Sequence, residues 1–247
     1  MRRVTRLDLD PEAQADLDSR QAACDRRRAE ATLDVQAEWR SARQTNTLTS
    51  VLATLRHMMG DRQRCMYCLD SHGTDVEHFW PKTPFPQRMF VWLNLLLCCA
   101  ECGRFKGDQF PLSNGQPLLL DPTVEDPWLH LDFDPRTGNF VARFDAGRND
   151  YSPKGSQTVD VLHLDRREAL AAGCQKTFRR LARSVEEALS QATPSAGSLL
   201  TALREADEHG LLGWCFGPSG QNEAPFRDLR ERHPALWNAC AQAVRET

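Results

Sequence analysis

Apolar residues recur at steps of three and four in the last third of the chain, which is the spacing of an amphipathic helix. The clearest helix is expected to begin with Asp165 as its N-cap, and these residues form its apolar face: Leu170, Cys174, Phe178, Leu181, Val185 and Leu189. A further helix is predicted to end near His209, and two short ones are predicted at 225–232 and 234–245. Residues 211–216 are expected to form a short strand or a buried turn.

The first sixty residues are also expected to be helical, although their apolar stripe is thin. Asp10 followed by Pro11 is typical of a helix start, and one long polar helix is predicted from there to about Arg43. We interpret it as a solvated helix along one edge of the protein. The alternative is an arm that docks a partner protein or the DNA backbone through the arginines at 26–28. A second helix is predicted to end at Gly60.

Strand patterns are short and few. Residues 130–134 and 139–143 flank a Pro-Arg-Thr-Gly turn and predict a β-hairpin, whereas 149–157 is expected to be a loop. The fold class that follows is α+β and mostly helical. We expect three parts, namely an N-terminal helical arm, a compact module, and the hairpin with a C-terminal helical region: 1–60, 61–112 and 113–247.

Composition is typical of a soluble globular protein. The chain has 247 residues, of which 40% are hydrophobic and 26% charged, and its formal net charge is −3. Bulk charge therefore gives no attraction for nucleic acid, and any such binding must come from a local patch. Between Arg56 and Lys106 there are seven Lys/Arg and five Asp/Glu, which is a modest local excess of positive charge.

The expected location is the cytoplasm. The first ten residues, MRRVTRLDLD, lack the apolar core of a signal peptide. No segment approaches the roughly 20 apolar residues that cross a bilayer, so no membrane contact is expected. The nine cysteines are an odd number and several are scattered, which fits a reducing compartment better than a disulfide framework.

Two Cys-x-x-Cys pairs, Cys65/Cys68 and Cys99/Cys102, stand about thirty residues apart. This spacing lets one tight turn present two thiolates to one ion, so the four thiols predict a structural zinc site. Such a site would supply on the order of 10 kcal/mol of folding free energy. Disulfides, a thioredoxin-type redox pair and buried unligated cysteines are the alternatives. Cys98 is expected to point into the core, because only Cys99 has the required spacing to Cys102.

An Asp-Val-Glu-His run between the two pairs ends in Glu77 and His78. Phosphodiester hydrolysis needs a base for water, a hard cation on the phosphate and a cationic group for the remaining charge. His78 suits the base, because an ordinary imidazole has a pKa of about 6.5. Glu77 offers an oxygen ligand to Mg²⁺ or Mn²⁺. Lys106 and Arg104 are expected to reach phosphate oxygens, with Lys82 as a further nucleic-acid contact.

Together these residues resemble the HNH endonuclease family, which has a ββα-metal fold. The likeness covers about 45 residues: Cys-x-x-Cys, Asp-Val-Glu-His with a proline three residues later, an Asn-Leu, and Cys-x-x-Cys followed by Lys-Gly-Asp. The resemblance implies that His78 is the general base, that Glu77 binds the catalytic metal, and that Asn94 orients the base. It also implies cleavage of nucleic acid, which we expect to be DNA.

One position departs from the family pattern. The third metal-site residue of the family, a His or Asn, falls on Gly103, which has no side chain to offer. Asp75, Asp108 or His72 is expected to substitute, or water to fill the gap. The alternative is a degenerate nuclease that keeps its zinc and binds nucleic acid or protein without cutting.

A looser likeness continues through Phe110 and Pro111 and along the segment 117–127. It resembles the HNH proteins of bacterial anti-phage defence systems, which act beside an ATPase partner. This resemblance implies a defence effector that an ATPase partner switches on, with the N- and C-terminal helices as docking surfaces.

Overall fold

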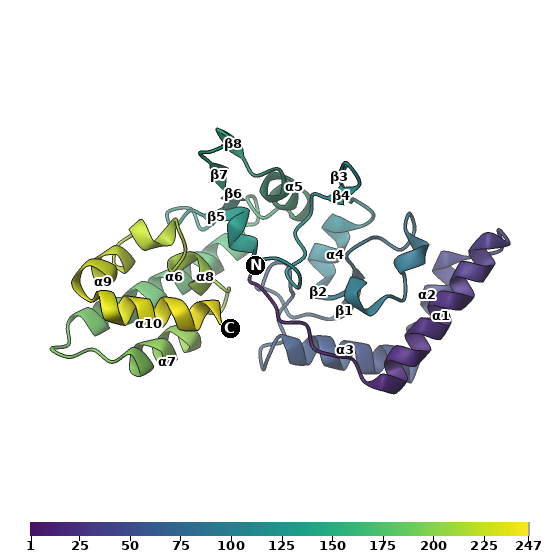
Figure 1. The fold of residues 1–247 in the computed structure, drawn as a ribbon, viewed down its shortest axis with the longest axis horizontal. Coiled ribbons are helices and arrows are strands. Elements are labelled where there is room, and N and C mark those ends of the chain that lie inside the picture. Colours follow the sequence, from purple (N-terminus) through teal and green to yellow (C-terminus); the bar gives the residue numbers. More distant parts are fainter. Residues whose placement is uncertain (247) are drawn as a thin grey trace.

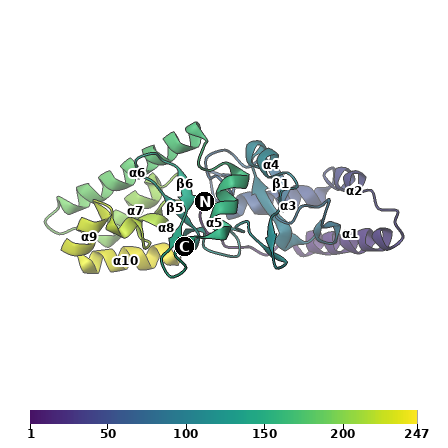
Figure 2. The same cartoon turned by 90° about the horizontal axis from the view of Figure 1, so that it is seen from above.

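The computed structural model describes residues 1–246 of the chain. The protein is elongated, with three helices at one end, five helices at the other, and a centre that holds the strands (Figure 1). The two helical groups also lie apart in the view from above (Figure 2). The prediction of an α+β, mostly helical fold is confirmed. Within residues 1–246, no helix has the length and apolar character needed to cross a membrane.

The N-terminal arm contains three helices rather than the two predicted: α1 (Pro11–Ala29), α2 (Val35–Ala42) and α3 (Asn46–Met58). The expected long helix is broken at Ala31, whose φ of 56° is left-handed. Asp34 then starts α2 by accepting two backbone N–H groups of its first turn. A capping aspartate competes with helix continuation, which explains the break. An ion pair between Arg27 and Glu38 holds α2 beside α1.

The centre begins with an antiparallel strand pair followed by a helix: β1 (Asp75–His78), β2 (Leu95–Cys98) and α4 (Ala100–Lys106). Asp75 pairs with Cys98, and His78 pairs with Leu95. Every residue of β2 is buried, and α3 packs against both strands. The loop between the strands contains two short 3-10 helices: η1 (Pro86–Arg88) and η2 (Trp92–Asn94). The order is strand, strand, helix, as expected for the module.

Small hairpins and one helix follow: β3 (Leu112–Ser113), β4 (Gln116–Pro117), η3 (Pro127–Leu129), β5 (Leu131–Phe133), β6 (Phe140–Ala142), β7 (Phe144–Asp145), β8 (Asp150–Tyr151) and α5 (Pro153–Leu162). The β5–β6 hairpin confirms the one predicted. The predicted loop at 149–157 is wrong, because Ser152 caps α5 and Pro153 occupies its first turn. Ser152 followed by Pro153 is the local signal for this helix start, because serine caps a helix and proline fits its first turn.

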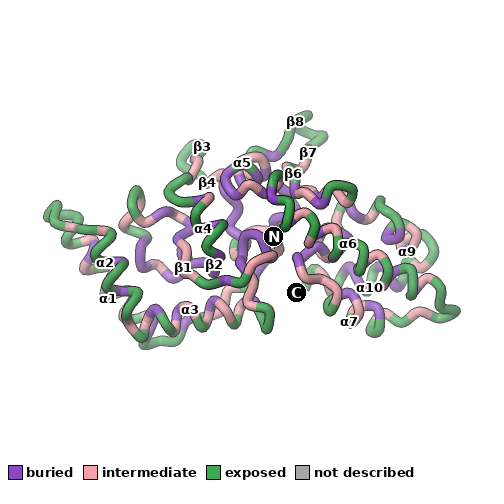
Figure 3. Tube along the Cα trace, turned by 180° about the vertical axis from the view of Figure 1, so that it is seen from behind, coloured by how far each residue is buried: buried purple, intermediate pink, exposed green. Residues whose placement is uncertain are grey.

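The C-terminal lobe, residues 167–245, begins with Arg167, the N-cap of α6, and is built from α6 (Glu168–Leu189), α7 (Ala196–Ala206), α8 (Leu212–Cys215), η4 (Gly220–Asn222), α9 (Phe226–Arg232) and α10 (Pro234–Arg245). The last two helices confirm those predicted. The expected cap of α6 is wrong, because Arg167 holds the N-cap position while Asp165 pairs with Arg166. Residues 211–216 contain α8 instead of a strand. Buried residues run along the inner faces of the lobe and the centre (Figure 3).

Candidate metal centre and active site

The four cysteines of the two Cys-x-x-Cys pairs meet at one point of the centre. Cys65 and Cys68 lie in the loop before β1, Cys99 caps α4, and Cys102 lies within α4. All four are buried, and their sulfur atoms lie within 4.8 Å of one another. A tetrahedral zinc with bonds of about 2.3 Å to sulfur requires sulfur atoms about 3.8 Å apart. The donor set and its spacing therefore fit a structural metal such as zinc.

Local hydrogen bonds hold this cluster. Cys99 Sγ accepts the backbone N–H of Cys102 at 3.4 Å and lies 3.9 Å from Cys68 Sγ. In the first pair, the N–H of Leu69 donates to the carbonyl of Cys65 at 2.9 Å and closes the turn. Cys98 is buried, and its thiol contacts the carbonyl of Cys99 at 3.2 Å. It is not a member of the four-sulfur group, as its spacing predicted.

His78 ends β1 and is buried, with 3% of its surface exposed. Its Nε2 lies 2.9 Å from the carbonyl oxygen of Met89, and the ring of Trp39 packs edge-on at 4.3 Å. Burial first, and the charge of Lys82 second, lower the pKa of His78 to about 3. The imidazole is therefore neutral at pH 7. Because a carbonyl only accepts hydrogen bonds, the ring proton is on Nε2 and Nδ1 is the basic nitrogen.

Glu77 and Lys106 form an ion pair beside this histidine, in which the lysine is fully buried and the acid is partly exposed. Lys106 Nζ lies 2.9 Å from Glu77 Oε1 and 2.7 Å from the carbonyl oxygen of His78. Burial raises the pKa of Glu77, and the ammonium of Lys106 opposes that rise. Lys106 itself is fully buried. The sequence predicted that Lys106 faces a phosphate. In the structure it does not, because its ammonium holds the acid and the end of β1.

Gly103 lies beside the same acid. A Cβ atom at Gly103 would be 3.5 Å from Glu77 Oε2. The position that carries a metal ligand in the HNH family is thus next to Glu77, without a side chain. Within residues 1–246, the four cysteines are the one group of three or more such donors close enough to share an ion. Glu77 therefore belongs to no group of three or more donors with Asp75, Asp108 or His72 among these residues.

Asn94 stabilises the loop around His78 rather than the imidazole ring. Its Oδ1 accepts the N–H of Trp80 at 2.7 Å, and its Nδ2 donates to the carbonyls of Trp80 and Arg88 at 3.0 and 2.9 Å. These three bonds occupy the side-chain amide of Asn94. The contact to the imidazole ring of His78 that was expected of Asn94 is made by the carbonyl of Met89 instead. Asn94 therefore acts on His78 indirectly, through the shape of the loop.

Of the two cations that the sequence predicted, the half-buried Lys82 acts on Glu77 and His78 through its charge, and the exposed Arg104 lies on α4. Two cations were missed. The guanidinium of Arg88 lies over the ring of Trp80 at 4.4 Å, and Arg40 lies on α2. No carboxylate among residues 1–246 pairs with any of these four cations.

The placement of Arg40 follows from its neighbours on α2. Gln36, one turn earlier, contacts Thr83 at 3.4 Å, and Arg43, three residues later, pairs with Asp75 at 3.1 Å. Residues three and four apart share a helix face, so Arg40 lies on the side of α2 that borders β1. Figure 2 places α2 and α4 on the same side of the molecule. Sequence reasoning missed Arg40 because only the fold brings α2 to β1.

The family comparison is limited, since no protein-family model matches the chain. Curated proteins are more informative. The chain is similar to the Septu protein PtuB of Bacillus thuringiensis, at 31% identity over 134 residues, covering 52% of this chain and 47% of that protein. A Septu protein PtuB of Bacillus mycoides strain KBAB4 is 30% identical over 136 residues, covering 42% of this chain and 44% of that protein. The chain spans a little under half the length of these relatives. This similarity supports the likeness to anti-phage defence proteins.

Proposed function

We propose that the protein is a metal-dependent HNH-type endonuclease that hydrolyses phosphodiester bonds in nucleic acid, with DNA as the expected substrate. One observation carries the proposal. The unit β1–β2–α4, closed by the four-cysteine centre, brings Glu77 next to the Cβ direction of Gly103, and His78 follows Glu77 at the end of β1. These are the positions that bind the metal and activate water in the family the sequence resembles.

Each residue has a role that its surroundings support. A Mg²⁺ or Mn²⁺ ion held by Glu77, with water at the position left open by Gly103, would stabilise the leaving oxygen. Neutral His78 takes the proton of the attacking water at Nδ1, while Nε2 stays fixed by the carbonyl of Met89. The cations Lys82, Arg88, Arg104 and Arg40 hold the phosphate backbone.

Because His78 is buried, the structure represents a closed state of the proposed active site. Water reaches the imidazole only after the loop 79–94 or α2 moves, because Trp39 and Met89 cover the ring. The similarity to Septu PtuB supports a role in anti-phage defence. We therefore propose an effector of such a system whose site opens when a partner protein binds, an ATPase in the systems that the sequence resembles.

A second candidate function has a specific observation in its favour. Lys106 already neutralises Glu77, and Gly103 offers no ligand, which is the arrangement expected of a degenerate site. The protein would then be a zinc-stapled module that binds nucleic acid or protein without cutting.

Plasmid cleavage separates the two functions. Wild type is assayed alone and with its co-purified partner, in Mg²⁺, Mn²⁺ or EDTA, beside His78→Ala and Gly103→Asn. The nuclease proposal expects cleavage by wild type that EDTA and His78→Ala both abolish. Cleavage by Gly103→Asn alone, which restores a side chain next to Glu77, would instead support the degenerate module.

A further inference from the structure

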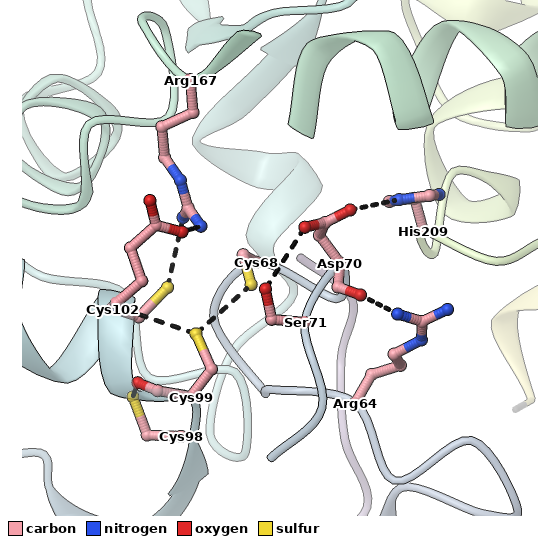
Figure 4. A network of polar contacts seen from close by, with 10 residues as sticks. Arg64, Cys68, Asp70, Ser71, Cys98, Cys99, Cys102, Arg167 and His209 are labelled. Atoms are coloured by element: carbon pink, nitrogen blue, oxygen red, sulfur yellow. Dashed lines mark hydrogen bonds and ion pairs between the residues drawn. The ribbon is translucent and has the colours of Figure 1, made fainter. Parts of the chain in front are cut away.

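The four-cysteine centre lies against the C-terminal lobe, and Cys102 of the second pair and Asp70, next to the first pair, each make a polar contact to that lobe (Figure 4). From the second pair, Cys102 Sγ accepts a hydrogen bond from Arg167 Nη1 at 3.3 Å. From the first pair, Asp70 stands two residues after Cys68, and its Oδ1 lies 3.3 Å from His209 Nε2. Neither Arg167 nor His209 belongs to the ββα unit.

The Arg167 contact is buried and aimed at sulfur. Only 7% of this side chain is exposed, and its guanidinium also pairs with Glu101 and lies 5.7 Å from the ring of Phe105. Arginine is charged at every accessible pH, and a buried charge needs a charged partner. A neutral thiol is a weak acceptor, whereas a metal-bound thiolate is anionic and accepts strongly. Arg167 thus fits the metal-loaded form of Cys102 better than the free thiol.

The Asp70 contact continues into the same helix of the lobe. His209 Nδ1 lies 2.8 Å from the hydroxyl oxygen of Thr177, in the middle of α6. Gly173 makes room for this arrangement, since a Cβ there would lie 2.8 Å from His209 Nε2 and 3.4 Å from Asp70 Oδ1. Glycine inside a helix costs about 1 kcal/mol relative to alanine. Both cysteine pairs are therefore connected to α6, once at its N-cap and once near its middle.

We propose that the four-cysteine centre is also the joint between the module and the C-terminal lobe, so that metal binding and docking of α6 strengthen each other. A zinc ion with four thiolates carries a net charge of −2, and Arg167 offsets part of it in a buried site. A coupling of this kind is reciprocal, because each event stabilises the state that the other prefers. The joint goes beyond the nuclease function and does not depend on cleavage.

Metal affinity tests one direction of the coupling. Zinc is titrated against a chromophoric chelator in the full chain, in wild type, Arg167→Met and Arg62→Met. Arg62 is the matched control, because it donates to the carbonyls of Glu205 and Asp207 in the same lobe without touching a thiol. Arg167→Met should weaken zinc binding 10- to 100-fold, as removal of outer-shell partners does, and Arg62→Met by about two-fold or less. Equal affinities in the two variants would overturn the proposal.

Hydrogen exchange tests the other direction in the unmodified protein, so this arm does not depend on the folding of a variant. The exchange of amides in α6 and around His209 is compared before and after zinc is removed by a chelator. The joint predicts faster exchange at the start of α6 and near Thr177 once the metal is lost. Faster exchange in β1, β2 and α4 with no change in α6 would contradict it.

Discussion

The buried His78 predicts a pH dependence of stability whose size follows from its surroundings. Its side chain is 3% exposed, and burial lowers its pKa to about 3 from the ordinary value of 6.5. The unfolded chain therefore takes up this proton more readily than the folded protein, and stability rises with pH. The contribution is fully present above pH 6.5 and is lost as the pH falls toward 3.

The size of the effect follows from the two pKa values. As the pH falls from 7 to 5, the imidazole becomes protonated in the unfolded chain but stays neutral in the folded protein, and the resulting loss of stability is about 2 kcal/mol. Over the whole interval down to the native pKa the loss is on the order of 5 kcal/mol.

The comparison is wild type against His78→Gln, in urea unfolding followed by circular dichroism at pH 7 and pH 5 with zinc held constant. Glutamine does not titrate, and it keeps an N–H donor for the carbonyl of Met89. Other titrating groups, such as Glu77 and His209, are common to both proteins and cancel. Between pH 7 and pH 5, the free energy of unfolding of wild type should fall by about 2 kcal/mol more than that of the variant. Equal losses would refute a buried, neutral imidazole.

Three further predictions follow from the site. Lys106→Met should lower the free energy of unfolding in urea by about 3 kcal/mol, because Glu77 is left as a partly buried charge without its partner. Adding Glu77→Gln should recover most of that loss, and no recovery would exclude the ion pair as the cause. Arg40→Glu should weaken the binding of labelled DNA and lower the salt dependence of that binding, both measured by fluorescence anisotropy. The matched control Arg183→Glu, at an exposed position of α6, should leave both unchanged. Cys65→Ser should lose zinc and solubility, measured by elemental analysis and melting, and normal values for both would contradict a structural metal centre.

The parts of the site that share a local motif could be predicted from the sequence. The spacing of the cysteine pairs fixes which sulfur atoms can meet, and the structure brings Cys65, Cys68, Cys99 and Cys102 together. The β5–β6 hairpin and the helices α9 and α10 followed from turn and capping residues.

The rest depends on contacts between segments that are distant in the sequence. Lys106 looks like a free cation in the sequence, and only packing of α4 on β1 shows that it is buried against Glu77. The amide of Asn94 is used by backbone groups of the loop, which no spacing rule indicates. Arg40 and Arg167 reach the module from α2 and the start of α6. A single left-handed residue, Ala31, divided the expected long helix.

The most direct test of the central claim is metal-dependent cleavage of plasmid DNA by wild type and His78→Ala, each purified with its partner and assayed with Mn²⁺ and with EDTA. We expect that wild type cuts with Mn²⁺, that EDTA stops the reaction, and that His78→Ala is inactive while its zinc content and unfolding curve match wild type. Full activity of His78→Ala, or undiminished cleavage by wild type in EDTA, would contradict it.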